Sequence, residues 1–265
     1  MQDLLLDTWQ PRLSTRDLGR GTCSMLPETD STNVQLRQLA QSGAPHGSLC
    51  CADMQTAGRG RLGRSWHSPA GQGLWLSVLL RPNLSPAQAP LVTFLAAMAM
   101  AQAVRETARI PCDIKWPNDL VSGGKKLCGI LLEVSADMEH INHLIVGTGL
   151  NVKRGAYPAE LAHQATSIED ITTPPARGKI LAAYLNALEA LLDRLEQGGF
   201  GAIAADYMRQ CVTIGSRVQV IGAESFTGVA EAIDDTGALL VWDDAGVLRR
   251  VLSGDVSVRG VMGYV

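Results

Sequence analysis

The spacing of apolar residues predicts an α+β chain built on a mixed or antiparallel sheet. Five short apolar runs, bounded by Gly, Pro or Asn, have the length and composition of β-strands, and several are joined by tight turns rather than crossover helices. Ser31 or Thr32 is placed to cap a helix that ends near Gly43. We expect the helices on one face of the sheet. The predicted strands cover residues 48–54, 74–80, 112–116, 126–134 and 143–152.

Three further segments predict helices. Residues 90–104 are strongly apolar but fall short of the roughly 20 residues that cross a bilayer, and Thr93 and Gln102 interrupt them, so we expect a buried helix. Residues 176–197 carry an apolar stripe with helical periodicity that ends at Gly198 and Gly199. A second helix is expected over residues 200–211.

The pattern changes after residue 211. Short β runs follow one another closely, separated by the turn signals DDTG and DDAG, and such runs predict a small β-barrel. We therefore place a domain boundary between residues 211 and 212, which divides the chain into domains 1–211 and 212–265. The predicted strands of the second domain cover residues 217–221, 226–233, 238–242, 247–252 and 255–259.

Composition excludes several classes of protein. The 265 residues carry a formal net charge of −3, whereas a general nucleic-acid-binding surface needs many Lys and Arg contacts. Asp3 and Asp7 interrupt any signal-peptide pattern at the start, so we expect a cytoplasmic protein without a membrane segment. The six cysteines include no C-x-x-C pair, and we expect them to be buried apolar residues and not metal ligands.

Positive charge is concentrated in residues 58–66, which read GRGRLGRSW. The glycines match G-x-G-x-x-G, but no helix start and no acidic residue about 20 positions later complete a dinucleotide site. The SGGKK stretch at 122–126 likewise lacks the other residues of a P-loop. An arginine-rich arm for nucleic acid is a minor alternative, because no aromatic residues interleave with it. We favour a flexible loop whose guanidinium groups hold an anionic, hydrolysable intermediate.

Five motifs that occur in order define a resemblance. They are DSTN at 30–33, QTAGRGRLGRSW at 55–66, KWPNDL at 115–120, GKKLCGIL at 124–131 and GTGLNV at 147–152. In order and spacing, the chain resembles the biotin protein ligase family over essentially its whole length. IDDTGALLV at 233–241 and GDVSVRG at 254–260 resemble the SH3-like C-terminal domain of that family.

The resemblance implies a fold and an activity. The fold would be a biotin- and ATP-binding catalytic domain of the biotin/lipoate ligase and class II synthetase-like type, followed by an SH3-like β-barrel. The activity would join biotin to the α-phosphate of ATP with the help of Mg²⁺, and then transfer biotin to a lysine of a biotin carboxyl carrier protein. Some family members carry an N-terminal DNA-binding domain. DSTN begins at residue 30 here, so we expect the monofunctional type, with no DNA as a partner.

The resemblance also assigns roles to individual residues. Lys126 is expected nearest the biotin carboxylate and the α-phosphate, whereas Lys125 is expected to be a solvated turn lysine. Gln55 is expected to bind the ureido ring of biotin together with Ser31 and Thr32. The catalytic set is Lys126, Arg59, Arg61 and Asp119, and the ligand-binding set is Ser31, Thr32, Asn33, Gln55, Gly58, Arg64, Trp66, Lys115, Asn118, Gly129, Asn151 and Arg259.

Structural roles compete with several of these assignments. Ser31 and Thr32 also suit a helix cap, and Asn118 and Asp119 suit a turn. Trp66 suits core packing, Arg259 suits an exposed strand position, and a solvated turn position is the less favoured role for Lys126. Lipoate ligases and octanoyltransferases of the same fold are the main alternative function, although their substrates need no ureido partners. A noncatalytic nucleic-acid-binding protein is the second alternative. The sequence leaves the oligomeric state open, with a homodimer among the possibilities.

Overall fold

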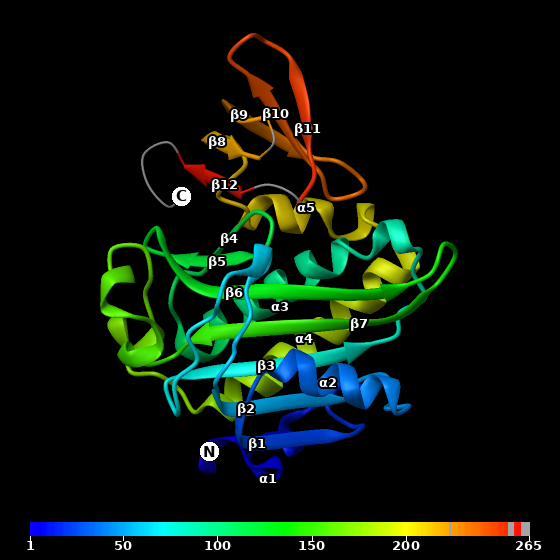
Figure 1. The fold of residues 1–265 in the computed structure, drawn as a ribbon, viewed down its shortest axis with the longest axis vertical. Helices are drawn as coiled ribbons and strands as arrows, with labels where there is room; N and C mark the ends of the chain where they lie inside the picture. The colour runs from blue at the N-terminus through cyan, green and yellow to red at the C-terminus, as the bar shows by residue number, and fades with distance from the viewer. Residues whose placement is uncertain (223, 254–256, 261–265) are drawn as a thin grey trace.

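Two β-sheets organise the chain in the computed structural model, which describes residues 1–222, 224–253 and 257–260. Figure 1 shows the larger sheet crossed by the segment that joins its second and third strands, with the smaller sheet beyond one edge. The larger sheet has the order β1-β2-β3-β7-β6-β5-β4, and β1 and β2 run parallel while the other described neighbours run antiparallel. Its strands are β1 (Cys23–Thr29), β2 (Leu49–Gln55), β3 (Gly73–Leu80), β4 (Asp113–Lys115), β5 (Asp119–Ser122), β6 (Lys125–Ala136) and β7 (Ile141–Asn151).

The mixed sheet confirms the predicted fold class and all five strands predicted for it. Two of its strands were not predicted. β1 contains Pro27 and shows no alternation of buried and exposed positions, and β5 has four residues inside the KWPNDL motif and just after it. β1 reaches β2 through a helix, which accounts for the parallel pair.

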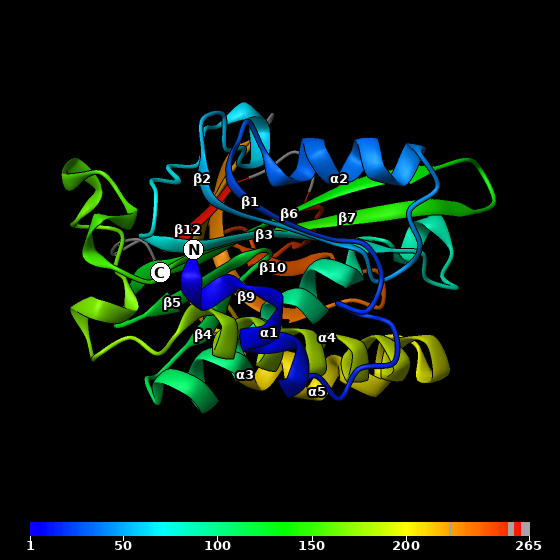
Figure 2. The ribbon, with the colours of Figure 1, turned by 90° about the horizontal axis from the view of Figure 1, so that it is seen from below.

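Helices cover both faces of the larger sheet (Figure 2), so the expectation of helices on one face is wrong. The amphipathic helix α2 packs Leu36 and Ala40 against Cys50, Leu79 and Ile145 of the sheet, while the three longest of the remaining helices lie on the opposite face. A sheet with apolar residues on both faces must be covered on both. The helices are α1 (Leu6–Trp9), α2 (Thr32–Gln41), α3 (Leu91–Ala108), α4 (Arg177–Gly198) and α5 (Gly201–Gln210).

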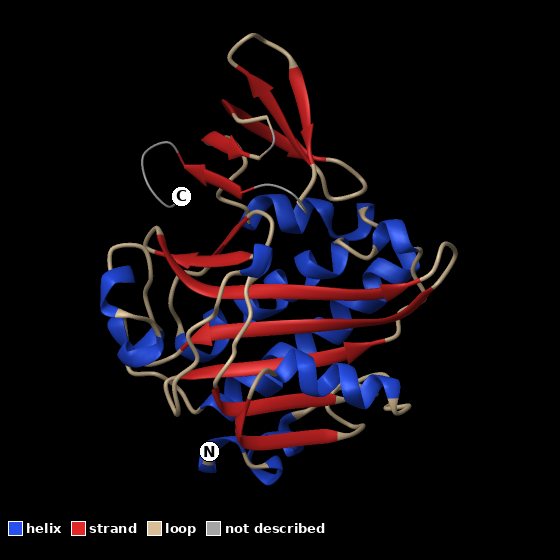
Figure 3. Ribbon diagram, viewed as in Figure 1, coloured by secondary structure: helices blue, strands red, loops and turns tan. Residues whose placement is uncertain are grey.

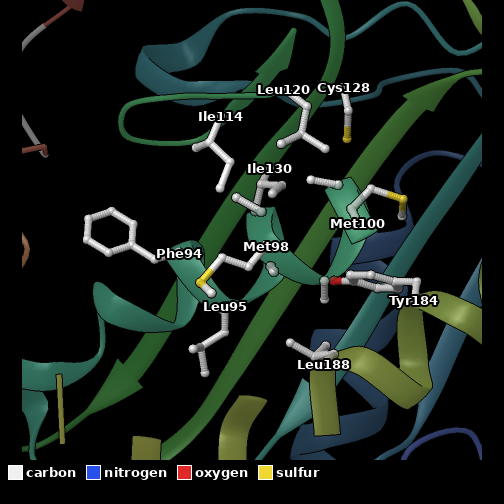
Figure 4. Close-up of a cluster of buried hydrophobic side chains, with 14 of the residues drawn as sticks. Phe94, Leu95, Met98, Met100, Ile114, Leu120, Cys128, Ile130, Tyr184 and Leu188 are labelled. Carbon is white, nitrogen blue, oxygen red and sulfur yellow. The ribbon is translucent and has the colours of Figure 1, made fainter. Parts of the chain in front are cut away.

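The main core lies between the larger sheet and the helices α3 and α4 (Figure 4). Phe94, Leu95 and Met98 of α3, Ile130 of β6 and Tyr184 of α4 all belong to this one cluster of buried side chains. Residues 86–108 are long and apolar enough to cross a membrane by length and composition, but 14 of the 18 residues of α3 are buried, as expected for the buried helix that the sequence predicts. The six cysteines are free thiols, and five of them are buried.

The smaller sheet is antiparallel, with the order β11-β10-β9-β8-β12, and lies over α5 and the β4–β5 end of the larger sheet (Figure 3). Its strands confirm the predicted runs, although residues 255–256 of the last run lie outside the described residues. The indole N–H of Trp116 donates to the carbonyl of Gly237 at 3.2 Å and joins the two sheets. Closure into a barrel and the boundary at 211/212 stay predictions. The strands are β8 (Arg217–Ile221), β9 (Phe226–Ile233), β10 (Leu239–Asp243), β11 (Leu248–Val251) and β12 (Ser257–Gly260).

Candidate active site

A cavity of ≈ 650 Å³ lies over the face of the larger sheet that carries α2. Its walls come from the end of β2, the segment joining β2 to β3, the β4–β5 turn, strands β6 and β7, residues 156–165 and β12. In Figure 1 the cyan segment between β2 and β3 crosses in front of these strands. All the predicted site residues except Gly58 line this cavity, so residues from five separate motifs lie in one place.

One end of the cavity carries uncharged hydrogen-bonding groups. Oε1 of Gln55, at the end of β2, accepts from the backbone N–H of Thr32 at 2.9 Å and lies 3.1 Å from the Thr32 hydroxyl oxygen. Nε2 of Gln55 donates to Oγ of Ser68 at 2.8 Å. An amide nitrogen has two N–H groups, so one of them remains for a ligand while the amide oxygen is already engaged.

Ser31 and Asn33 flank Thr32 at the start of α2. Ser31 occupies the N-cap position, but its side chain makes no capping hydrogen bond, and it is buried where it lines the cavity. The side chain of Asn33 is engaged at both ends, because Oδ1 accepts from Ser77 at 2.6 Å and Nδ2 donates to Glu133 at 3.1 Å. Asn33 therefore supports the wall of the cavity.

Glycines on β6 and β7 make room for side chains on the floor of the cavity. Gly129 and Gly149 are paired across the two strands, and the indole of Trp66 lies on them. A Cβ at Gly129 would lie 2.8 Å from Trp66 Cζ3, and one at Gly149 would lie 2.4 Å from its Nε1. The predicted open approach at Gly129 is thus occupied by Trp66 in this structure.

The other end of the cavity is cationic. Lys126 Nζ lies 2.6 Å from Asp119 Oδ1 and 5.1 Å from the centre of the Trp66 ring, within the range of a cation–π contact. Two hydrogen bonds fix the backbone of Lys126, whose N–H donates to Gln164 at 2.8 Å and whose carbonyl accepts from Thr166 at 2.9 Å. The neighbouring residue, Lys125, is exposed, and its ammonium group donates to the Ala162 carbonyl.

Lys115 adds a buried positive charge beside this pair, with 5% of its surface exposed. The pKa of Lys115 is lowered from its ordinary 10.5 to about 8, chiefly by burial. Asp119 opposes this shift, and the positive charges of Lys126 and Arg259 add to it. A buried ammonium group of this kind is favoured when an anion is bound nearby. Arg259 itself lies on β12, is exposed and lines the mouth of the cavity.

The arginine-rich segment folds back on itself as a hairpin. The Trp66 N–H donates to Gly58 at 2.9 Å and the Gly60 N–H donates to Arg64 at 2.7 Å. Gly58 is needed at the base of this hairpin, because a Cβ there would lie 2.4 Å from the Trp66 carbonyl. Gly58 is therefore placed as a backbone residue of the loop, whereas the exposed Arg59 and Arg64 line the cavity.

Arg61 ties the hairpin to two other parts of the chain. Its guanidinium donates to Oδ1 of Asn118 at 2.7 Å and to the carbonyl of Ser253, just beyond β11. Asn118 in turn donates to the Ile130 carbonyl of β6 at 2.9 Å. Asn118 is thus positioned by both neighbours, and Arg61 spans from the loop to the smaller sheet.

Asn151 ends β7 at the cavity wall. Its amide donates to the Thr166 carbonyl at 3.0 Å, and Thr166 also bonds to the backbone of Lys126. Asn151 is therefore joined to Lys126 through one short segment.

Several residues of the site were not predicted from the sequence. Ser68, Ser77 and Glu133 complete the hydrogen bonds around Gln55 and Asn33, and Tyr157 and His163 line the outer wall. A signal existed for Ser77, since a hydroxyl inside the apolar run LWLSVLL needs a partner when it is buried. Nothing in the sequence distinguished Tyr157 or His163.

Comparisons with known proteins identify the family of the chain. Residues 25–151 match the model of the Biotin/lipoate A/B protein ligase family, and residues 213–259 match the Biotin protein ligase C terminal domain. The biotin–[acetyl-CoA-carboxylase] ligase of Mycobacterium tuberculosis is 36% identical over 267 residues, which cover 94% of this chain and 97% of that protein. The bifunctional ligase/repressor BirA of Bacillus subtilis is 36% identical over 232 residues, covering 86% of this chain and 71% of BirA.

A solved structure extends the similarity to the fold. The biotin protein ligase of Aquifex aeolicus, in complex with biotin and ATP, superposes with a TM-score of 0.77 at 30% identity and covers 90% of this chain and 99% of that one. The Mycobacterium tuberculosis relative, matched over 97% of its length, and the shared fold lead to one conclusion. The chain belongs to the biotin protein ligase family.

Proposed function

We propose that this protein is an ATP-dependent biotin–protein ligase, which forms biotinyl-5′-AMP from biotin and ATP and transfers biotin to a lysine of a biotin carboxyl carrier protein. The observation that carries the proposal is the division of one cavity into an uncharged hydrogen-bonding end at Gln55 and a cationic end at Lys126. Biotin has the same division, with a neutral ureido ring at one end and a carboxylate at the other.

The cationic end suits the first half-reaction. An oxygen of the biotin carboxylate forms a bond to the α-phosphorus of ATP, and the bond from that phosphorus to the departing pyrophosphate breaks. Two anionic groups must approach each other, and the charge that develops has to be stabilised by fixed cations. Lys126, Lys115 and Arg61 line this end, and we assign Lys126 to the carboxylate and α-phosphate.

The uncharged end suits the ureido ring. The free N–H of Gln55 would donate to the ureido carbonyl, and the hydroxyl oxygens of Ser31 and Thr32 would accept from the ring N–H groups. Because the Gln55 oxygen is already engaged by Thr32 at 2.9 Å, Gln55 acts here as a donor alone. This assignment narrows the sequence-based expectation that Gln55 both donates and accepts.

The remaining residues suit the nucleotide and the second half-reaction. We assign Trp66 and Asn151 to the adenine side, the exposed Arg59, Arg64 and Arg259 to the phosphates at the mouth, and Asn33 to support of the wall. In transfer, the carrier lysine loses a proton to solvent and attacks the acyl carbon of the mixed anhydride as the free amine. AMP leaves with the bonding electrons, and the second amine proton is released as the amide forms. Asp119 lies where it can attract the incoming ammonium group, in the same way that it now attracts Lys126.

Magnesium would enter with ATP as part of the substrate. Within the described residues, no group of three or more His, Cys, Asp or Glu side chains could hold a metal ion. Both a monomer and a homodimer are compatible with the reaction. We further propose that the protein works in the cytoplasm, where carrier and ATP are present, and that it needs no DNA.

The direct test of this function is ATP–pyrophosphate exchange with purified protein, Mg²⁺ and biotin, followed by transfer to an isolated carrier domain detected with streptavidin. Exchange that depends on biotin and labels one carrier lysine is the expected result. Lipoate ligase is the second candidate because the family model covers both acyl groups. Exchange with lipoate but not with biotin would select it.

A further inference from the structure

A chain of hydrogen bonds connects the biotin end of the cavity to an ion pair at the edge of α2. Glu133 on β6 accepts from Arg37 of α2 at 3.1 Å and, through its other oxygen, from Asn33 at 3.1 Å. Asn33 accepts from Ser77 at 2.6 Å. Ser77 lies 2.7 Å from the hydroxyl of Thr32, which faces Gln55. The chain therefore joins Glu133 to the proposed ureido site.

The ionised carboxylate of Glu133 determines which group donates and which accepts along this series of hydrogen bonds. An ionised carboxylate only accepts hydrogen bonds, so the NH₂ group of Asn33 must face Glu133 and its oxygen must face Ser77. The single hydroxyl proton of Ser77 is then committed to Asn33. Ser77 then has no proton left for Thr32, so across their 2.7 Å contact the Thr32 hydroxyl donates to Ser77, while the backbone N–H of Thr32 still engages Gln55. The Thr32 hydroxyl oxygen consequently keeps its lone pairs for a ligand.

The middle of this hydrogen-bond chain, at Ser77 and Asn33, is buried and tightly packed. Ser77 is fully buried, and Asn33 and Thr32 are 3% exposed, so a reversed hydrogen bond leaves a buried polar group without its partner. Gly147 of β7 passes directly over Asn33, where a Cβ would lie 2.2 Å from the Asn33 Oδ1. Asn33 is thus held in place, and reversal of its amide is the remaining freedom.

We propose that Glu133 is a positioning residue for biotin recognition, which orients the Asn33 amide so that Thr32 offers an acceptor to a ureido N–H while Gln55 offers a donor to the ureido carbonyl. The inference rests on the proposed function. It extends that function to a residue that does not line the cavity and does not touch the substrate.

A substitution can reverse the direction without removing a side chain. In Glu133→Gln the donors of Arg37 hold the new amide oxygen, so the new NH₂ group faces Asn33. Asn33 must turn its oxygen outward and its NH₂ group toward Ser77, which then donates to Thr32. The double variant Asn33→Asp/Glu133→Gln restores the original direction, because the carboxylate introduced at position 33 accepts from both neighbours, and it keeps the total charge of the wild type.

The test measures the Kd for biotin by calorimetry and the KM and kcat in ATP–pyrophosphate exchange. In Glu133→Gln we expect the Kd and KM for biotin to rise about tenfold, with the KM for ATP and kcat unchanged within twofold. Arg37→Gln is the matched control, since it removes the ion pair but keeps the carboxylate, and biotin affinity should remain at the wild-type value. Asn33→Asp/Glu133→Gln should recover most of the loss.

Three results would overturn the proposal: unchanged biotin affinity in Glu133→Gln, an equal loss in Arg37→Gln, or no recovery in the double variant. Should Glu133→Gln fail to fold, the double variant is compared with Asn33→Asp, which opposes two carboxylates and is expected to bind biotin far more weakly. A wild-type protein that shows no biotin-dependent exchange would reject the proposed function itself, a result distinct from the other three.

Discussion

Lys126 Nζ and Asp119 Oδ1 lie 2.6 Å apart on adjacent strands of one hairpin. The turn that joins these strands contains Gly123 and Gly124, both with positive φ, which glycine adopts without strain. The Lys126 side chain is 25% exposed and lines the cavity. A preorganised charge of this kind stabilises a developing anion without reorganisation during the reaction.

We predict that Lys126→Ala abolishes or severely reduces adenylate formation while the fold is retained. One preorganised donor at a developing oxyanion is worth roughly 2.7–4 kcal/mol, which corresponds to a loss of about 100- to 1,000-fold in exchange rate. Lys125→Ala is the matched control, because this exposed neighbour donates outward to Ala162 and should keep normal activity. Near-normal biotin-dependent exchange in Lys126→Ala would exclude the assignment.

We predict that Lys115 lowers the free energy of unfolding when no ligand is bound. Its pKa of about 8 lies below the ordinary 10.5, so at pH 7 the folded protein holds a buried charge, and Lys115→Met should raise the free energy of unfolding by roughly 1–3 kcal/mol. Between about pH 8 and pH 10.5 the unfolded chain binds more protons than the folded one, so the wild type gains stability there as pH rises.

Urea unfolding at pH 7 and pH 9.5 checks this prediction. The advantage of Lys115→Met over the wild type should shrink at the higher pH, while its exchange activity should be low at both. A variant less stable than the wild type at pH 7 would show that the folded protein favours the charged lysine without ligand.

Much of this architecture could be predicted from the sequence. The strands of both sheets and the buried helix α3 follow from apolar periodicity, and glycines mark the ends of α2 and α4. β1 was missed because Pro27 and Glu28 break its pattern, and β5 because its four residues are indistinguishable from a turn. The sequence did not predict that a helix covers the second face of the larger sheet, because α2 covers only a small apolar cluster there.

The site was predictable to the extent that its residues lie in motifs. Those motifs meet in one cavity, but the sequence could not show how polar groups satisfy one another across strands. Asn33 is a clear case, since its amide is consumed by Ser77 and Glu133, which lie 44 and 100 residues away in the chain. Trp66 is another, because its position over Gly129 and Gly149 depends on the hairpin that carries it.

The arginine hairpin is expected to move with ligand. Arg59, Arg61 and Arg64 carry like charges in a short segment, and without a bound anion their repulsion opposes the closed hairpin. We predict that the backbone amides of residues 58–66 exchange hydrogen slowly with biotin and ATP present and faster without them. Equal, slow exchange in both states would show that the loop is not a lid.

Arg61→Ala should release the intermediate. Arg61 joins the hairpin to Asn118 and to the Ser253 carbonyl, so its loss should open the cavity and let biotinyl-adenylate escape. Biotin should then appear on lysines of a bystander protein such as serum albumin. Arg16→Ala, which removes an exposed arginine paired with Asp193, should cause no such labelling, and an absence of labelling in Arg61→Ala would contradict the prediction.

The ureido partners should govern the choice of acyl group. Gln55→Leu combined with Ser31→Ala removes a donor and a hydroxyl while the cations around Lys126 stay in place. We predict a loss of biotin use with little change in the KM for ATP, measured by exchange at several biotin concentrations. An equal loss in ATP affinity would indicate that the double variant disturbs the whole cavity.

The ratio of exchange rates with biotin and with lipoate, measured on the wild-type protein, tests the central claim most directly. A site built to hydrogen-bond a ring N–H and a ring carbonyl leaves buried polar groups unpaired when it receives an aliphatic acid, which gives discrimination on the order of 10⁴. We predict strong exchange with biotin and essentially none with lipoate or octanoate. Equal or faster exchange with lipoate would contradict the assignment of this protein as a biotin ligase.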